Sequence, residues 1–383
     1  MKVQRMPRAI PWDEGHESFR EMTRSFVLNE VKPHMPRWRK EGMVSRDIWR
    51  KAGELGLICP NFPTEYGGAG ADFLYNAIVI EELAFAQCSE FFLLLHSDMV
   101  APYILDFGSE EQKKKYLPGI ISGETILAVS MSEPGTGSDL AAVQTRAEDK
   151  GDHFLLNGSK TFISNGQLAD VNIVAARTGE GPGGISLFIV ESKWPGYQKG
   201  KNLEKIGMKA QDTSEIFFED VKVPKENLLG KLNSGFRYLM QKLQQERLVI
   251  AIANQASAEA VLDMTVDYVH ERKAFGKKIG SFQNTRYKLA DILVEQEMAR
   301  AFLDQVLLAH VRGEKQMLQA SMVKLGCSEM LNRHVNTCLQ FFGGYGYMLE
   351  YPIATAYLDA RVQTIYGGTS EIMKEIIGKA MGL

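Results

Sequence analysis

The chain has 383 residues, of which 45% are hydrophobic and 24% are charged, and its formal net charge is −3. This near-neutral balance is typical of a globular protein and excludes a strongly basic nucleic-acid-binding chain. No run of about 18 apolar residues occurs and the N-terminal segment has no apolar signal core, so we expect no membrane span and a cytoplasmic location.

The cysteines and histidines predict no metal site. Cys59, Cys88, Cys327 and Cys338 lie far apart without CxxC spacing, and the 7 histidines form no HExxH motif. We therefore expect four buried thiols in a reducing compartment.

Residues 1–123 predict an N-terminal helical domain. Apolar residues recur there at three- and four-residue spacing in segments 19–31, 45–57, 74–86 and 109–121. At the start of the last segment, Ser109 is a candidate N-cap, and Glu110 and Glu111 follow it in the first turn.

Residues 124–230 predict a central β domain. Strand-like runs such as HFLLNGSKTFIS and ISLFIVES alternate with turn residues and suggest an antiparallel, barrel-like sheet. Gly179, Gly181 and Gly184 match GxGxxG, but a strand follows them where a dinucleotide site needs a helix. We interpret this match as a hairpin turn.

Residues 231–383 return to helical spacing and predict a C-terminal bundle, so the fold class is α+β with the order helices, sheet, helices. One long helix begins near residue 235 and carries a buried stripe with a carboxylate in it. The stripe consists of Leu239, Leu243, Glu246, Ile250, Ala253, Ser257 and Val261.

Glu246 has two interpretations of equal weight from this pattern. Burial raises the pKa of a carboxyl group, and a raised value suits a general base that works near neutral pH. The alternative is a buried salt bridge to an arginine of another helix. Neighbouring Arg247 points about 100° around the helix and is not automatically that partner.

Glycine and hydroxyl clusters indicate a polar cleft. The loop SMSEPGTGSDL follows a predicted strand and offers Ser130, Ser132, Thr136 and Ser138 around two glycines. Thr369, in YGGTSEI, can cap the last helix and leave its N-terminus free for a negative group. Ordinary turns and ordinary capping are the alternatives at both places.

Nine segments, taken together, resemble the acyl-CoA dehydrogenase family from about Trp12 to the C-terminus. They are FPTEYGGAGAD, EEQKKKYLPGIISGE, SMSEPGTGSDL, NGSKTFISNG, KIGMKAQDT, FEDVKVPKENLLG, ERKAFGKKIGSFQ, QFFGGYGYMLEYPI and ARVQTIYGGTSEIMKEI. The resemblance implies an N-terminal helical domain, a central β-barrel-like domain and a C-terminal four-helix bundle. It also implies bound FAD in a homotetramer, built as a dimer of dimers.

The resemblance assigns cofactor residues in three groups. Those expected at the flavin and its ribityl chain are Val129, Ser130, Ser132, Gly137, Ser138, Phe162, Ile163 and Ser164. Those expected to reach a neighbouring subunit's FAD are Arg272, Phe275, Gln283, Gln340, Gly343 and Gly344. Thr369 and Glu371 are expected at the pyrophosphate, and Phe162 stands where the family usually has Trp.

The resemblance also assigns the substrate site. Its expected contacts are Ser138, which touches the CoA arm, and Gln244, Arg247, Tyr366 and Gly368. Phe91 and Phe92 fall near the expected path of the acyl tail, although both suit a protein core equally well, so chain length stays open.

The position of the base departs from the commonest family pattern. Many members carry the catalytic glutamate where this chain has Gly367, whereas long-chain and isovaleryl-type members carry it on the long helix in a Glu-Arg-Leu context. This chain has Glu246-Arg247-Leu248, so both arguments select Glu246.

The resemblance implies α,β-dehydrogenation of an acyl-CoA to its 2,3-enoyl form. The backbone N–H of Gly367 would bind the thioester carbonyl, Glu246 would take the α-proton, and an electron-transfer flavoprotein would accept the electrons. An acyl-CoA oxidase or another flavin enzyme on this scaffold, and a non-catalytic CoA-binding or assembly protein, are the alternatives.

Overall fold

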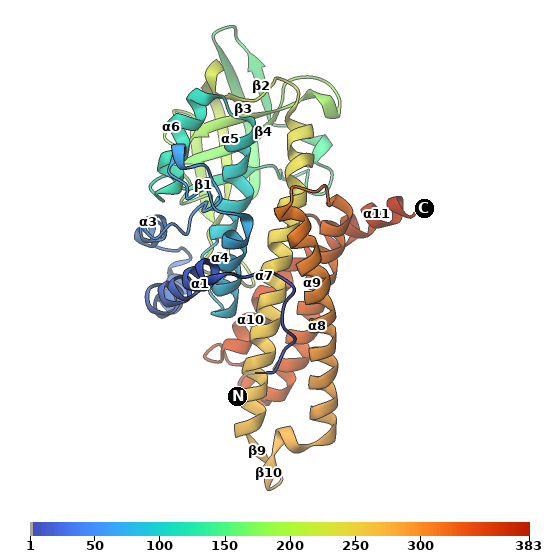
Figure 1. Cartoon of the computed structure of the whole chain (residues 1–383). Helices are drawn as coiled ribbons and strands as arrows, with labels where there is room; N and C mark the ends of the chain where they lie inside the picture. Colours follow the sequence, from blue (N-terminus) through green and yellow to red (C-terminus); the bar gives the residue numbers. More distant parts are fainter. Residues whose placement is uncertain (1–2) are drawn as a thin grey trace.

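The computed structural model describes residues 3–383 and shows helices, a sheet and helices in that order (Figure 1). The sheet lies at one end of an elongated molecule and a helical bundle at the other, with the N-terminal helices beside them. The predicted α+β class and its helix–sheet–helix order are confirmed.

The last three helices predicted in the N-terminal region match the structure to within three residues, but the first begins at Glu14 and not at residue 19, and the helices at residues 35–41 and 101–107 had no predicted counterpart. Ser109 accepts a hydrogen bond from the backbone N–H of Gln112 and forms a capping box, as its position predicted. Trp38 and Trp49, which belong to two of these helices, are fully buried. The helices are α1 (Glu14–Phe26), α2 (Met35–Glu41), α3 (Arg46–Glu54), α4 (Phe73–Phe85), α5 (Ala101–Phe107) and α6 (Glu110–Ile121). A buried π-helical segment, η4 (Leu95–Val100), leads directly into α5.

The central region is one eight-stranded sheet in the order β6-β7-β3-β2-β4-β5-β8, with β1 paired to β4. Most pairs are antiparallel as predicted, but β1 and β2 each pair with β4 in parallel, so the sheet is mixed. The strands are β1 (Leu127–Ser130), β2 (Arg146–Asp149), β3 (His153–Ser164), β4 (Val171–Arg177), β5 (Ile185–Glu191), β6 (Tyr197–Asn202), β7 (Thr213–Pro224) and β8 (Leu228–Leu229).

The glycine-rich stretch at residues 179–184 connects two antiparallel strands. Arg177 at the end of β4 is paired with Ile185 at the start of β5, and the register continues along both strands. The hairpin interpretation is therefore confirmed, and the GxGxxG match has no helix behind it.

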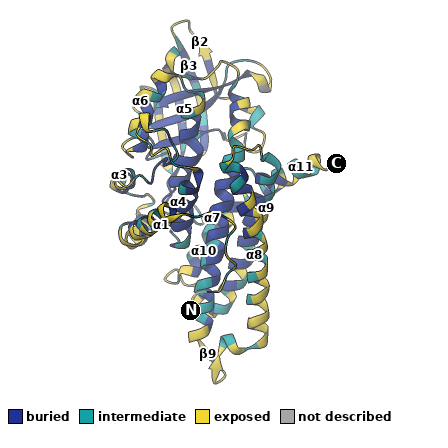
Figure 2. Ribbon diagram, viewed as in Figure 1, coloured by how far each residue is buried: buried dark blue, intermediate teal, exposed yellow. Residues whose placement is uncertain are grey.

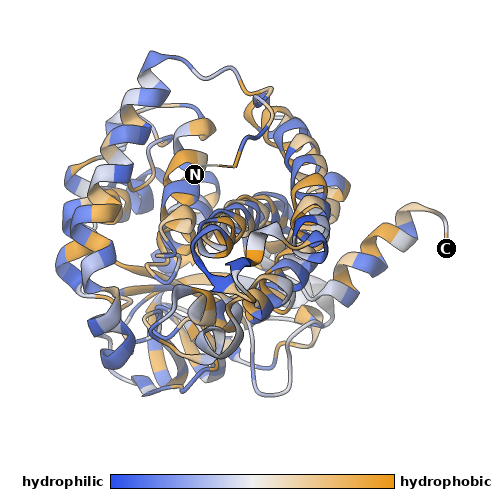
Figure 3. Cartoon of the chain, turned by 90° about the horizontal axis from the view of Figure 1, so that it is seen from below, coloured by the Kyte–Doolittle hydropathy of each residue, from blue (hydrophilic) through white to orange (hydrophobic). Residues whose placement is uncertain are grey.

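The C-terminal region is built around α7 (Gly235–Glu271), which runs from the sheet to the far tip of the bundle (Figure 1). Figure 2 shows α7 mostly buried and the outer side of α8 exposed. The last helix projects from the body in both views (Figures 1 and 3). The other elements are β9 (Lys273–Ala274), β10 (Lys277–Lys278), α8 (Gln283–Val311), α9 (Met317–Phe342), α10 (Pro352–Ala360) and α11 (Ser370–Ala380).

Candidate active site

A cavity of about 390 Å³ lies where the sheet, α7 and the turn before α11 meet. Residues from η4, β1, β3 and the loop after β1 complete its wall. It brings together twelve of the residues predicted from the sequence: Val129, Ser132, Gly137, Ser138, Phe162, Ile163, Ser164, Glu246, Arg247, Tyr366, Gly367 and Gly368.

Glu246 is buried in this wall without a cation. Its Oε1 accepts a hydrogen bond of 2.8 Å from the hydroxyl of Tyr103, and it forms no ion pair within residues 3–383. Burial raises the pKa of Glu246 to about 7, although the bond from Tyr103 and the charges of Arg247 and Lys242 act in the opposite direction. The salt-bridge interpretation of Glu246 is therefore wrong for this structure.

Arg247 points elsewhere, as its place on the helix predicted. Its Nη1 donates to Ser321 Oγ at 3.0 Å and lies 3.0 Å from Met317 Sδ. Its buried Nε has no hydrogen-bond partner among the described residues. Arg247 thus presents a spare donor close to the cavity it helps to line.

The turn that carries Gly367 packs against α7 one helical turn beyond Glu246. Gly367 has φ +63°, and a Cβ there would lie 2.3 Å from Ile250 Cδ1. Lys324 on α9 holds the turn through a 2.7 Å hydrogen bond from its Nζ to the carbonyl of Gly368. Among the described residues no acceptor is found for the backbone N–H of Gly367, which leaves that donor free at the cavity.

The loop after β1 is held by a buried ion pair. Lys160 Nζ lies 2.7 Å from Glu133 Oε1, and Glu133 also accepts the backbone N–H groups of Gln144 and Thr145. These contacts fix a loop whose next residues, Gly137 and Ser138, are exposed at the cavity.

Phe162 projects from a distortion in β3. The register with β7 shifts between Lys160 and Ile163, and Phe162 takes φ +57° with 70% of its side chain exposed. A left-handed backbone is uncommon for a bulky residue, and here it accompanies an exposed aromatic ring in the lining of the cavity. The predicted residue Ser130, at the end of β1, is buried outside the cavity lining, and its Oγ has no hydrogen-bond partner among the described residues.

The remaining predicted residues lie outside the cavity. Gln244 bonds the segment between α8 and α9, donating to the carbonyl of Glu314 and accepting from the N–H of Gln316. Thr369 caps α11, and with Glu371 it borders a separate hollow of about 340 Å³. The other six are exposed and lie near the β9–β10 hairpin or the end of α9: Arg272, Phe275, Gln283, Gln340, Gly343 and Gly344.

Three residues that position the site had not been selected from the sequence. The sequence could have indicated Lys324, because a lysine on an apolar helical face is unusual. Ala320, Cys327 and Leu331 share its face of α9. Tyr103 and Glu133 carry no comparable local signal, because their partners are distant in the sequence.

All four cysteines are free and buried, as predicted. No group of three or more His, Cys, Asp or Glu residues suited to a metal ion occurs within residues 3–383. Over the same range, no helix is long and apolar enough to cross a membrane.

Three family models cover most of the chain. Those described as the N-terminal, middle and C-terminal domains of acyl-CoA dehydrogenase match residues 13–124, 128–221 and 233–382. The long-chain specific acyl-CoA dehydrogenase of Sus scrofa, a mitochondrial protein, is 49% identical over 95% of this chain and 86% of its own length. The mitochondrial isovaleryl-CoA dehydrogenase of Pongo abelii is 39% identical over 88% of this chain and 80% of its own length.

Solved structures give the same result. An acyl-CoA dehydrogenase from Geobacillus kaustophilus is 46% identical with a TM-score of 0.96, over 97% of this chain and 99% of that one. A chain in a structure described as the electron transferring flavoprotein of Acidaminococcus fermentans is 35% identical with a TM-score of 0.93, over 97% and 99%. A glutaryl-CoA dehydrogenase from Mycobacterium smegmatis in complex with FADH2 is 28% identical with a TM-score of 0.91, over 97% and 95%.

Proposed function

Because the chain belongs to the acyl-CoA dehydrogenase family, whose members are oxidoreductases that dehydrogenate acyl-CoA thioesters, we propose that Glu246 is the base that takes the α-proton in this reaction. The observation that carries the proposal is a buried carboxyl group without a cation, in the wall of the same cavity as the unused N–H of Gly367. Gly367 itself offers no side chain that could take a proton, so the long-chain and isovaleryl-type arrangement is the one that fits.

The cavity fits the flavin that the family requires. The exposed ring of Phe162 would gain a cover, and Ser132, Ser164 and the exposed loop at Gly137 would supply polar groups. These residues would hold FAD, which when bound accepts the β-hydrogen as a hydride. Thr369 and Glu371 stand apart from this cavity and remain candidates for the distal phosphates.

The chain's own groups perform the proton chemistry. The N–H of Gly367 donates to the thioester carbonyl and stabilises the negative charge that develops on its oxygen, which acidifies the α-carbon. Glu246 accepts the α-proton, and its pKa near 7 keeps it both a competent base and partly ionised at neutral pH. Tyr103 orients the carboxylate through its hydrogen bond. The apolar residues Ile250, Leu95 and Met99 exclude water from the reacting carbons.

Electron transfer and assembly extend the proposal beyond the single chain. We take an electron-transfer flavoprotein as the acceptor, in a homotetramer where Arg272, Phe275 and Gln283 reach a neighbour's FAD. Their exposure supports this, because Phe275 is 95% exposed and the Arg272 guanidinium lies 5.5 Å from the ring centre of Tyr345 at the same tip. Sedimentation of a flavin-loaded monomer at micromolar concentration would contradict the shared site.

Two further expectations stay proposals. The domain limits 1–123, 124–230 and 231–383 follow the change of periodicity in the sequence. The cytoplasm remains the proposed location, and the mitochondrial location of the Sus scrofa relative belongs to that protein. Cell fractionation decides the compartment.

Anaerobic titration of the purified, FAD-loaded protein with acyl-CoA tests the activity. The flavin absorbance should bleach, and an electron-transfer flavoprotein should restore it faster than dissolved oxygen does. Faster recovery with oxygen would identify an acyl-CoA oxidase, and no bleaching with short, long or branched acyl-CoA would refute dehydrogenation.

A further inference from the structure

A second, much smaller cavity of about 40 Å³ lies behind the active-site cavity. Phe92 and Tyr366 are the two residues that line both spaces. Their rings are stacked, with centroids 6.0 Å apart and planes 14° from parallel. We call this pair the aromatic wall and the space behind it the rear chamber.

The cavity lining gives the acyl tail an apolar direction to follow from the reacting carbons. On the proposed function, the thioester lies between Glu246 and Gly367, and the polar CoA arm leaves past the exposed Ser138. Tyr366 directly precedes Gly367, and Leu95, Met99 and Ile250 continue the apolar lining towards Phe92. A hydrocarbon tail therefore runs towards the aromatic wall.

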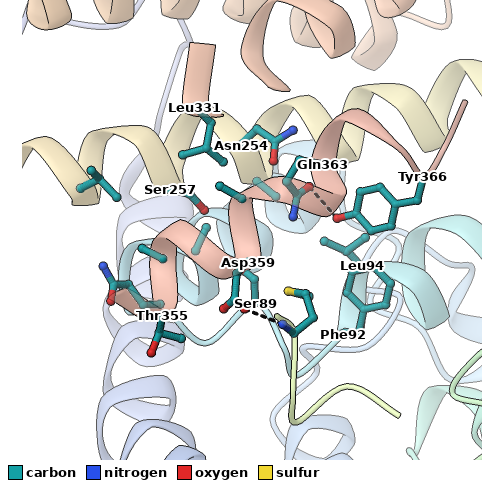
Figure 4. Close-up of a pocket in the computed structure, with 17 residues that line it drawn as sticks. Ser89, Phe92, Leu94, Asn254, Ser257, Leu331, Thr355, Asp359, Gln363 and Tyr366 are labelled. Carbon is teal, nitrogen blue, oxygen red and sulfur yellow. Dashed lines mark hydrogen bonds between the residues drawn. The ribbon is translucent and has the colours of Figure 1, made fainter. Parts of the chain in front are cut away.

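The rear chamber has a mixed lining, in which polar side chains stand among apolar ones such as Leu94, Val261 and Leu331. Figure 4 shows polar side chains around it, namely Ser89, Asn254, Ser257, Thr355, Asp359 and Gln363. Asn254 is 1% exposed, and its Nδ2 has no hydrogen-bond partner among the described residues. The chamber has room for a few waters, whose hydrogen bonds a methyl-ended tail cannot replace.

Hydrogen bonding fixes one half of the wall. The hydroxyl of Tyr366 donates to Gln363 Oε1 at 2.6 Å, which holds the ring between the two spaces (Figure 4). Phe92 is 4% exposed and has no polar group that could anchor it. Phe92 is therefore the half of the wall whose size a mutation can change without breaking a hydrogen bond.

We propose that the aromatic wall of Phe92 and Tyr366 ends the acyl site and sets the longest hydrocarbon tail that the enzyme accepts, while the rear chamber behind it accepts a hydroxyl-ended tail once the wall is opened. The inference rests on the proposed function and names its substrate class. It assigns the chain-length limit to Phe92, and it assigns tail polarity to the chamber.

The test measures kcat/KM of the FAD-loaded enzyme over straight-chain acyl-CoAs that lengthen by two carbons at each step. In the wild type, kcat/KM should rise by roughly fourfold per added methylene while the apolar path fills. It should then fall about tenfold or more at the first tail that meets the wall. Phe92→Ala, and the milder Phe92→Leu in case the first fails to fold, should move that break to longer tails.

Phe91→Leu is the matched control. Phe91 is also fully buried, but it packs edge-on against Trp49 and lines neither space. This variant should keep the wild-type break. A second comparison pairs methyl-ended with ω-hydroxyl acyl-CoAs of equal length, and Phe92→Ala should favour the hydroxyl-ended member of each long pair.

The outcomes separate cleanly. An unchanged break in both Phe92 variants, an equal shift in Phe91→Leu, or a preference of Phe92→Ala for methyl ends overturns the inference and leaves the dehydrogenase proposal standing. Failure of every acyl-CoA to bleach the wild-type flavin refutes the dehydrogenase proposal and this inference with it.

Discussion

Two buried glutamates on neighbouring helices show how differently one fold can treat the same side chain. Glu81 on α4 is fully buried and Glu246 on α7 is 7% exposed. Burial alone would raise the pKa of both. Yet the charges of Arg8, Arg300 and Arg20 outweigh burial and lower the pKa of Glu81 to about 2. The pKa of Glu246, in contrast, is raised by burial to about 7.

The difference lies in what reaches each carboxylate. Glu81 Oε1 lies 2.6 Å from Arg8 Nη1 and 3.0 Å from Arg300 Nη1, and its Oε2 lies 3.0 Å from Arg20 Nη1. Arg8 comes from the N-terminal segment and Arg300 from α8, so the cluster ties the N-terminal region to the bundle. Among residues 3–383, the Glu246 carboxylate receives a hydrogen bond only from the neutral hydroxyl of Tyr103. Burial therefore creates a base only where the fold withholds cations.

Replacing Glu246 should have the largest effect on chemistry. Glu246→Gln keeps the shape but cannot take a proton, so the rate of anaerobic flavin reduction should fall by roughly 10²- to 10⁴-fold. Stopped-flow absorbance measures that rate, and unchanged FAD content controls for folding. Near-normal reduction would remove Glu246 from its role.

The same variant should alter stability with a defined sign. The folded-state pKa of Glu246 lies above the ordinary value of 4.5, so its ionisation destabilises the folded protein increasingly as pH rises from 4.5 to about 7. Glu246→Gln should therefore gain stability relative to wild type above pH 7, and show no such gain below 4.5.

Replacing Glu81 should have the opposite pattern of effects: it should lower stability and leave flavin reduction intact. Glu81→Gln leaves three arginines around an uncharged amide and should lower the free energy of unfolding by about 3–5 kcal/mol near neutral pH, as measured in urea. The folded-state pKa of Glu81 is depressed, so its contribution is present above 4.5 and lost as pH falls towards 2. Flavin reduction per folded, FAD-loaded protein should stay near wild type, and a loss like that of Glu246→Gln would make the contrast false.

Removing the hydroxyl that Glu246 accepts should have a moderate, pH-dependent effect. The bond from Tyr103 stabilises the ionised carboxylate, so Tyr103→Phe should raise the pKa of Glu246 further above 7. Flavin reduction should slow by about tenfold at pH 7, since a bond to a charged group is worth roughly 1.5–3 kcal/mol, and should approach wild type at high pH.

Tyr116→Phe controls for losing a buried hydroxyl that bonds a carboxylate. Its hydroxyl lies 3.0 Å from Glu191 Oε1, outside the active-site cavity. This variant should leave the midpoint of the pH–rate profile in place. An equal loss at every pH in Tyr103→Phe would indicate a purely structural role for Tyr103.

The two glutamates also show which features of the site could be predicted from the sequence. Helical periodicity is local, so the stripe on α7 predicted the burial of Glu246 correctly, although Leu243 and Ser257 in that stripe are only partly buried. Its hydrogen-bond partner is 143 positions away, and no pattern of spacing reports such a pairing. For the same reason, the stripe could not exclude a salt bridge at Glu246, and it could not predict the cluster of arginines around Glu81.

In the sheet too, local pairing could be predicted from the sequence and distant pairing could not. The strand-like runs on either side of the glycine-rich stretch predicted the β4–β5 hairpin, because adjacent strands pair across a short turn. The parallel partners of β4 are β1 and β2, both separated from it by other elements, so the mixed character of the sheet was not visible. The aromatic wall likewise joins Phe92 to Tyr366 across most of the chain.

The smallest expected effect concerns a second base placed at position 367, in the same cavity as Glu246. Gly367 and Glu246 line one cavity, and Ile250 lies one turn along α7 from Glu246, so a carboxylate at position 367 would enter the same wall. In Gly367→Glu, two nearby carboxylates would compete and one pKa would rise. Glu246→Gln with Gly367→Glu removes that conflict, and its flavin reduction should exceed that of Glu246→Gln alone by about tenfold, well short of wild type.

Two costs limit the recovery of activity in this double variant: φ +63° at position 367 disfavours a side chain by about 1–3 kcal/mol, and the Cβ of that side chain would meet the flexible end of Ile250. Adding Ile250→Ala opens that space and should raise the rate again, whereas Ile250→Ala in the Glu246→Gln background alone should not. If the triple variant binds FAD and acyl-CoA but stays as slow as Glu246→Gln, positions 246 and 367 do not serve one α-carbon, and proximity in the cavity wall is too loose for proton transfer.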